Sequence, residues 1–151
     1  MTNYISKIVP HVYVKKSLEA VKLYKEAFGL EDKGEPWIDD DGVLVYQELW
    51  RNGELFISVS EDKHLFPEFV EDYPVGSRPI MLFIVYFESD DDLQKAFDLL
   101  YIEGNPCKRI TQVPNEDTIC VFIDKFGVYW HYQVPLNRNA SFVPKGFPGN
   151  N

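Results

Sequence analysis

VKKSLEAVKLYKEAFGL, residues 14–30, contains the end of a strand and a complete helix signal. Ser17 stands where an N-cap residue belongs, because its side-chain oxygen can accept a hydrogen bond from a backbone N–H of the first turn. Apolar residues then recur at helical spacing, at Leu18, Val21, Tyr24, Ala27 and Phe28. Gly29 follows at the position where a left-handed residue commonly ends a helix. The stretch therefore predicts an amphipathic helix that ends at Phe28.

Strand patterns surround this helix in the first half of the chain. Residues 7–14 (KIVPHVYV) are β-branched and apolar. Val43–Trp50 and Glu54–Ser60 are joined by Arg51-Asn52-Gly53, a sequence typical of a hairpin turn. A short extra strand is expected at Leu30–Gly34. The first half therefore predicts the order strand, helix, three strands.

The second half repeats this order of elements. Pro79–Phe87 predicts a strand, and Ser89 with Asp92 resembles a capping box for a helix that we expect to end at Gly104-Asn105. Three strand patterns follow, at Cys107–Val113, Thr118–Asp124 and Val128–Val134. Two such units in succession favour an α+β fold. We place the first module at 1–62, a linker loop at 63–78, the second module at 79–134 and a C-terminal tail at 135–151, with both modules in one structural domain.

The bulk composition limits the classes of function. The chain has 151 residues, of which 45% are hydrophobic and 26% charged, as expected of a globular protein. Its formal net charge of −9 repels phosphate backbones, so we expect no nucleic-acid partner. The sequence shows neither a signal-peptide pattern nor a membrane helix, so we expect a cytoplasmic protein. Its two cysteines, Cys107 and Cys120, form no disulfide framework, and we expect both thiols to be buried.

Three segments together resemble one known family. The 14–30 segment resembles the first strand end and helix of the vicinal oxygen chelate superfamily, which contains glyoxalases, bleomycin-resistance proteins and dioxygenases. DKFGVYW, residues 124–130, is similar to the D-P-F-G-x-x-W turn before that family's last strand, with Lys125 in place of proline. NGELFIS, residues 52–58, is similar to the fourth strand of bleomycin-resistance and PhnB-like members. The resemblance covers residues 7–134, nearly the whole chain outside its tail.

This resemblance implies two βαβββ modules that form one curved mixed sheet around a cavity, with the helices on the convex face. Members usually dimerise, so it also implies a homodimer. Many members hold a divalent metal ion in the cavity on four side chains. In this chain those positions fall near Val9, Ser58, Leu82 and His131. Because valine and leucine have no donor atom and serine is a poor ligand for first-row transition metals, we expect no metal cofactor.

A different set of donors keeps one divalent metal ion open as an alternative. Strand alternation puts His11 on the same face as position 9. With His131 and a carboxylate such as Glu48, it would form the two-histidine, one-carboxylate set of non-haem iron or zinc sites. That set predicts a metal-dependent lyase, isomerase or dioxygenase.

Without a metal, the predicted cavity is a groove lined largely by aromatic side chains. Alternation and the family register point eight side chains into it: His11, Tyr13, Phe56, Ser58, Leu82, Tyr86, Tyr129 and His131. Aromatic faces bind planar or cationic molecules, and an acidic protein attracts cations. We therefore expect a protein that binds a small cationic or aromatic molecule without catalysis. The alternative for each aromatic residue is that it packs the core.

Overall fold

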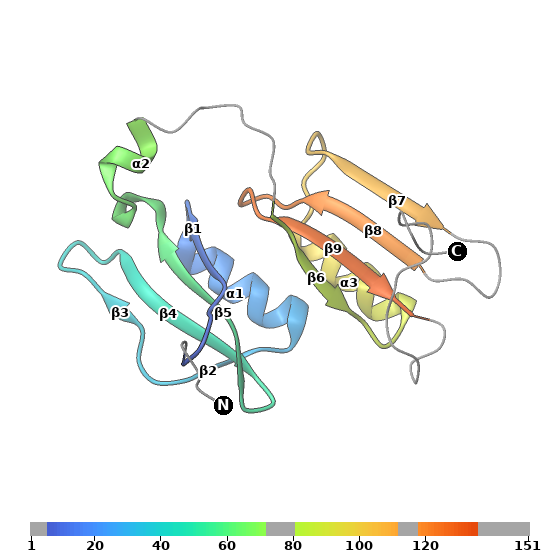
Figure 1. Cartoon of the computed structure of the whole chain (residues 1–151), viewed down its shortest axis with the longest axis horizontal. Coiled ribbons are helices and arrows are strands. Elements are labelled where there is room, and N and C mark those ends of the chain that lie inside the picture. Colours follow the sequence, from blue (N-terminus) through green and yellow to red (C-terminus); the bar gives the residue numbers. More distant parts are fainter. Residues whose placement is uncertain (1–5, 72–80, 112–117, 136–151) are drawn as a thin grey trace. The chain divides into compact units, whose positions relative to one another are not determined.

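The computed structural model describes residues 6–71, 81–111 and 118–135 (Figure 1). The chain divides between Ser77 and Arg78 into two compact units, each with its own mixed sheet. The second unit has the element order β-α-β-β-β, and the first unit has the same order with one additional short strand, which confirms the predicted α+β class and its βαβββ modules. None of the helices in these ranges combines the length and the apolar character needed to cross a bilayer.

The first unit is a five-stranded sheet with one face covered by α1 (Ser17–Phe28). Its strands are β1 (His11–Val14), β2 (Glu31–Asp32), β3 (Trp37–Ile38), β4 (Leu44–Arg51) and β5 (Glu54–Glu61). Their order is β1-β5-β4-β2, with β3 also paired to β4, and β1 runs parallel to β5. The covered face buries Val12, Val14, Leu49, Ile57 and Val59. The extra strand expected at Leu30–Gly34 is thus the two-residue β2, whereas β3 was not expected.

The segment after β5 is only partly the loop that the sequence predicts. It contains the 3-10 turn η1 (Asp62–His64) and the short helix α2 (Pro67–Glu71). The prediction of an irregular linker at 63–78 is therefore wrong for these stretches, and residues 72–78 lie outside the described residues. The predicted tail at 135–151 likewise lies outside them, except for Pro135.

The first turn of α1 is capped by a residue of β5 and not by Ser17. Lys16 takes the N-cap position in a left-handed conformation (φ 57°), and Ser17 is the first helical residue. The Glu61 carboxylate accepts hydrogen bonds from the backbone N–H groups of Ser17 at 2.9 Å and Lys16 at 3.1 Å. It also accepts the Ser17 hydroxyl proton at 2.7 Å. The prediction that Ser17 is the cap is therefore wrong, because a carboxylate from a distant strand supplies the acceptors, as the helix dipole favours.

The β4–β5 hairpin has the predicted turn and one irregularity. Asn52 (φ 51°) and Gly53 (φ 79°) form a two-residue turn with both residues left-handed, which suits Asn-Gly. Farther along, Leu49 pairs with Ile57 but Trp50 pairs with Leu55, so Phe56 is an extra residue on β5. Such a bulge breaks the simple alternation of side chains between the two faces of the sheet.

The second unit repeats the architecture of the first. Its elements are β6 (Phe83–Tyr86), α3 (Asp90–Leu100), β7 (Cys107–Thr111), β8 (Thr118–Ile123) and β9 (Tyr129–Val134). The sheet order is β6-β9-β8-β7, and β6 runs parallel to β9 as β1 does to β5. The core is rich in rings, since Trp130, Tyr132 and Phe122 are all at most 1% exposed.

The ends of α3 test two further predictions. Ser89 caps the helix as predicted, because its side chain accepts a hydrogen bond from the Asp92 N–H at 3.1 Å. The helix ends at Leu100 and not at Gly104-Asn105, since Tyr101 is already extended (φ −80°, ψ 144°). The Tyr101 ring stacks on that of Phe97, with 4.7 Å between centroids, which helps to hold the chain in this turn away from the helix.

The two cysteines differ in exposure. Cys120 on β8 is buried, as predicted, but Cys107 on β7 is exposed. The prediction is wrong for Cys107 because β7 is the last strand in the sheet order. An edge strand leaves its side chains less covered than a central one.

The same five-residue turn occurs once in each unit, as D-x-x-G-V. At Asp39–Val43 and at Asp124–Val128, the aspartate Oδ1 accepts hydrogen bonds from the backbone N–H groups two and four residues later. The fourth residue is a left-handed glycine, Gly42 (φ 79°) or Gly127 (φ 92°). The first turn leads from β3 into β4 and the second from β8 into β9. The aspartate and glycine of the 124–130 motif therefore serve to build a turn.

Candidate functional site

One face of the first sheet is turned away from α1 and carries polar and aromatic side chains. We call it the polar face, and its members are His11, Tyr13, Tyr46, Glu48, Trp50, Ser58 and Ser60. The strand register brings them together, since Ser58 pairs with His11 on one side and with Glu48 on the other. Tyr13 is 43% exposed, so solvent reaches this face.

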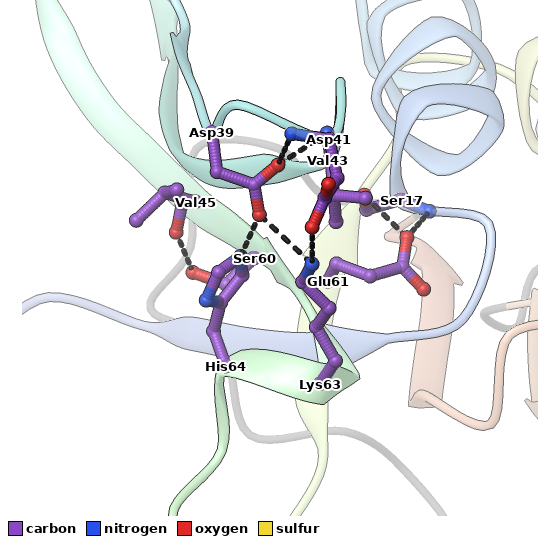
Figure 2. A network of polar contacts seen from close by, with 9 residues as sticks. All are labelled: Ser17, Asp39, Asp41, Val43, Val45, Ser60, Glu61, Lys63 and His64. Carbon is purple, nitrogen blue, oxygen red and sulfur yellow. Dashed lines mark hydrogen bonds and ion pairs between the residues drawn. The ribbon is translucent and has the colours of Figure 1, made fainter.

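His11 lies between two serines of β5. Its Nδ1 is 2.5 Å from Ser58 Oγ, and its Nε2 is 2.9 Å from Ser60 Oγ. The Ser60 hydroxyl donates its proton to the Val45 carbonyl at 2.6 Å (Figure 2), so its oxygen accepts from His11 Nε2–H. Nδ1 is then the acceptor for Ser58, and we assign this tautomer from the network. Desolvation lowers the pKa of His11, which favours the neutral ring.

Two tyrosine rings flank the imidazole of His11. The Tyr46 ring stacks on it with 5.7 Å between centroids, and the Tyr13 ring meets it edge-on at 4.7 Å. Stacked and edge-on arrangements are the favoured geometries of such rings. His11 is therefore fixed on both nitrogens and held by aromatic rings, so its orientation is preset.

Glu48 is held by its two neighbours on the same face of β4. Tyr46 Oη donates to Oε2 at 2.7 Å, and Trp50 Nε1 donates to Oε1 at 3.1 Å. These hydrogen bonds, the one from Tyr46 first, lower the pKa of Glu48 and keep it ionised. Burial and the bond to Glu48 in turn raise the pKa of Tyr46. The ammonium of Lys33 lies 3.7 Å from the centroid of the Trp50 ring.

Phe56 does not share this environment. Its ring lies 5.2 Å from that of Phe28, at the end of α1. Simple alternation places Phe56 with Ser58 in the predicted cavity, but Phe56 is itself the extra residue of the bulge, between the Leu55–Trp50 and Ile57–Leu49 pairs. We therefore correct the prediction and place Phe56 against the helix.

In the second unit the corresponding face lies on β6 and β9. The register pairs Ile84 with His131 and Tyr86 with Gln133. Tyr86 is 41% exposed, whereas His131 and Gln133 are buried. His131 Nε2 donates to Gln133 Oε1 at 3.0 Å. Burial lowers the pKa of His131, and the bond to Gln133 offsets only part of this effect. Leu82, half-buried, immediately precedes β6.

A hollow of about 320 Å³ opens beside Tyr129, a volume at the lower end for small-molecule sites. It is lined by Pro106, Cys107, Lys108, Val121, Phe122, Ile123 and Tyr129. The hollow lies wholly within the second unit. Among its lining residues Lys108 carries the charge, and the remaining walls are largely apolar.

The donors present do not fit the divalent metal ion that the sequence resemblance implies. In the described parts of the chain, no group of three or more His, Cys, Asp or Glu side chains is arranged to hold a metal ion. Both nitrogens of His11 face serine hydroxyls, and both oxygens of Glu48 accept hydrogen bonds from ring groups. A metal on these residues would have to displace four hydrogen bonds. At the family's own positions, Val9 and Leu82 have no donor atom.

Sequence reasoning missed two members of this neighbourhood, Tyr46 and Ser60, together with Lys33. The signal for Tyr46 was available, because it lies two residues before Glu48 on a strand and so shares its face. Ser60 follows from Ser58 by the same rule. Lys33 comes from the segment after β2, whose path no periodic pattern fixes.

A second polar cluster lies where η1 meets the turn before β4 (Figure 2). Asp39 Oδ2 is 3.0 Å from Lys63 Nζ and 3.2 Å from His64 Nε2, the latter too poorly aligned for a hydrogen bond. The backbone N–H of Val43 is the main cause that lowers the pKa of Asp39 to about 2, with Lys63 adding to it. This cluster ties η1 to the turn, so we assign it a structural role.

Comparison with known proteins gives a likeness in structure. No family model matches the chain, and no curated protein matches it. Protein PA1353 from Pseudomonas aeruginosa is similar with TM-score 0.62 and 18% identity over 87% of this chain and 98% of that one. The PhnB protein from Bacillus cereus gives TM-score 0.61 and 18% identity over 85% and 99%. A glyoxalase/bleomycin resistance protein/dioxygenase family enzyme from Burkholderia phytofirmans gives 0.55 and 10% over 83% and 94%.

These likenesses, at low sequence identity, establish the fold. The chain has the same βαβββ-module fold as these solved structures.

Proposed function

We propose that this chain is a glyoxalase/bleomycin-resistance-like protein that binds a small molecule without catalysing its reaction. The observation that carries the proposal is the state of His11 and Glu48. Their donor and acceptor atoms are engaged by serines, Tyr46 and Trp50, so they are built as walls of a site and not as free ligands or bases. We assign the chain to the bleomycin-resistance or PhnB-like branch on the motif at residues 52–58.

The class of ligand follows from the chemistry of the polar face. Tyr46 and Trp50 flank one ionised carboxylate, that of Glu48, and Tyr13 lies on the same face beside His11. Rings of this kind bind planar groups by stacking and cations through their faces, and a nearby carboxylate adds attraction for a cation. We therefore propose an aromatic or cationic ligand. His131, Tyr86, Tyr129 and Leu82 in the second unit are proposed to contribute to the same function.

We also propose that the protein has no nucleic-acid partner, forms a homodimer and is cytoplasmic. The net charge of −9 supports a protein without a nucleic-acid partner. The fold likeness supports a homodimer by analogy alone. A cytoplasmic location accords with the cysteine content, since two cysteines give no disulfide framework.

Ligand binding is tested by the thermal stability of the purified protein. A ligand that binds only the folded state raises the melting temperature in a concentration-dependent way. We expect aromatic amines or quaternary ammonium compounds to raise the melting temperature. This effect should weaken in Glu48→Gln but be retained in the matched control Glu26→Gln, since Glu26 is an exposed residue of α1. Equal responses of the two variants would remove the polar face from the proposal.

The metal-dependent alternative makes the opposite prediction. The neighbour from Burkholderia phytofirmans is described as an enzyme, so a lyase, isomerase or dioxygenase activity is the competing function. It requires near-stoichiometric zinc, iron, nickel or manganese, lost on His131→Ala or His11→Ala. Elemental analysis of protein purified without chelators decides between the two, and such a metal would overturn the binding proposal.

A further inference from the structure

We propose that Trp50 and Glu48 form a subsite for organic cations, and that Lys33 occupies this subsite in the free protein. The inference rests on the proposed binding function and specifies the ligand group that the polar face recognises. That group is an ammonium, a quaternary ammonium or a guanidinium. Lys33 would then be an internal competitor that a ligand has to displace.

The ammonium group of Lys33 lies over the ring of Trp50. Its Nζ lies 3.7 Å from the centroid of the Trp50 ring, well inside the distance of about 6 Å within which a cation is attracted to an aromatic face. Tryptophan is the best of the aromatic residues for this contact. Trp50 is half-buried, whereas Lys33 is exposed. The protein therefore already shows a cation bound at this position.

Glu48 makes the ring a better cation site. The indole Nε1 donates its proton to Glu48 Oε1 at 3.1 Å, which pushes electron density into the ring. The other carboxylate oxygen is anchored by Tyr46 Oη at 2.7 Å, so the carboxylate is fixed beside the ring. The pKa of Glu48 is lowered by these bonds, and the Coulombic effects of Lys7 and Lys33 act in the same direction. A cation over the ring is thus attracted by a face and a fixed charge together.

Lys33 is suited to leave this position. It is exposed and follows the two-residue strand β2, so its side chain can move into solvent without disturbing the sheet. A tethered lysine on the ring reduces the apparent affinity for any external cation, because the ligand must first displace the lysine from the ring. Because the Lys33 ammonium competes for the Trp50 ring, the subsite would favour ligands whose cationic group is larger or less hydrated than an ammonium.

The test uses a charged and a neutral aromatic probe, benzyltrimethylammonium and N,N-dimethylbenzamide, titrated into the full chain by calorimetry. We expect Lys33→Gln to raise the affinity for the cation about two- to five-fold, the size of one cation–π contact at an exposed site. The affinity for the amide should stay unchanged. Trp50→Leu should abolish the preference for the cation, with its fold checked by circular dichroism.

Lys7→Gln is the matched control, because Lys7 also acts on Glu48 through its charge. An equal gain in Lys7→Gln and Lys33→Gln would reduce the effect to net charge and overturn the proposal, as would no gain in Lys33→Gln. Binding of the amide without any preference for the cation would overturn the subsite and leave the binding function standing. If neither probe binds any variant, the polar face does not take these ligands and both proposals fall.

Discussion

Asp124 anchors the turn before β9, and its removal should cost more stability than any exposed carboxylate. Its side chain is 0% exposed and accepts hydrogen bonds from Phe126 N and Val128 N at 2.9 Å and from Trp130 Nε1 at 2.8 Å. A buried donor that loses its acceptor costs about 1–3 kcal/mol. Asp124→Ala deprives three donors, and we expect a loss of about 3–5 kcal/mol because such costs are not fully additive.

Asp124→Asn separates the turn from the indole. The amide oxygen can still accept from the two backbone N–H groups, but its NH₂ then faces the Trp130 N–H, which should cost about 1–3 kcal/mol. Combining it with Trp130→Phe gives a double-mutant cycle in urea unfolding followed by circular dichroism. A coupling of about 1.5–3 kcal/mol is expected for a hydrogen bond to a charged group. Additive losses, with coupling within about 0.5 kcal/mol of zero, would refute the reasoning.

Glu61 and His11 should each make the protein less stable as the pH falls, Glu61 because it loses its charge and His11 because it gains one. Burial raises the pKa of Glu61, but the hydrogen bonds from Ser17 and Lys16 together lower it by more. The contribution of Glu61 to stability is therefore present above the ordinary glutamate pKa and is lost as the pH falls through the lowered pKa of the folded state. The stability advantage of wild type over Glu61→Gln should therefore shrink in acid, and a constant difference in urea unfolding would contradict this. Desolvation lowers the pKa of His11, so its contribution is complete above about pH 6.5 and declines below it. His11→Gln should lose less stability than wild type between about pH 7.5 and 5.5, and parallel curves would show that His11 does not cause the decline.

The parts of the fold that follow from local sequence were predictable. The α1 pattern, the Asn52-Gly53 hairpin turn and the Ser89 cap each depend on residues within a few positions of one another, and all three were confirmed. The cap of α1 was not predictable, because Glu61 lies 44 residues from Ser17. A local pattern shows that a helix needs an acceptor at its first turn but not which distant residue supplies it.

The candidate site was predictable as far as strand alternation holds. His11, Tyr13 and Ser58 lie on one face because β1 and this part of β5 are regular. Phe56 was misplaced because the bulge changes the alternation, and no glycine or proline marks it. Lys33 was missed because a cation–π contact from an irregular segment depends on tertiary packing, which no spacing rule encodes.

The D-x-x-G-V turn also bears on the history of the two halves. If one module arose by copying the other, equivalent loops should join equivalent strands. Here the loop precedes the next-to-last strand of the first unit, β4, and the last strand of the second, β9. Duplication therefore explains the common element order but not the common loop, and superposing the halves on Asp39 and Asp124 would align the wrong strands. The backbone hydrogen bonds to the aspartate lie within the five residues of the turn, so the same turn can form between strands that are not equivalent in the two modules.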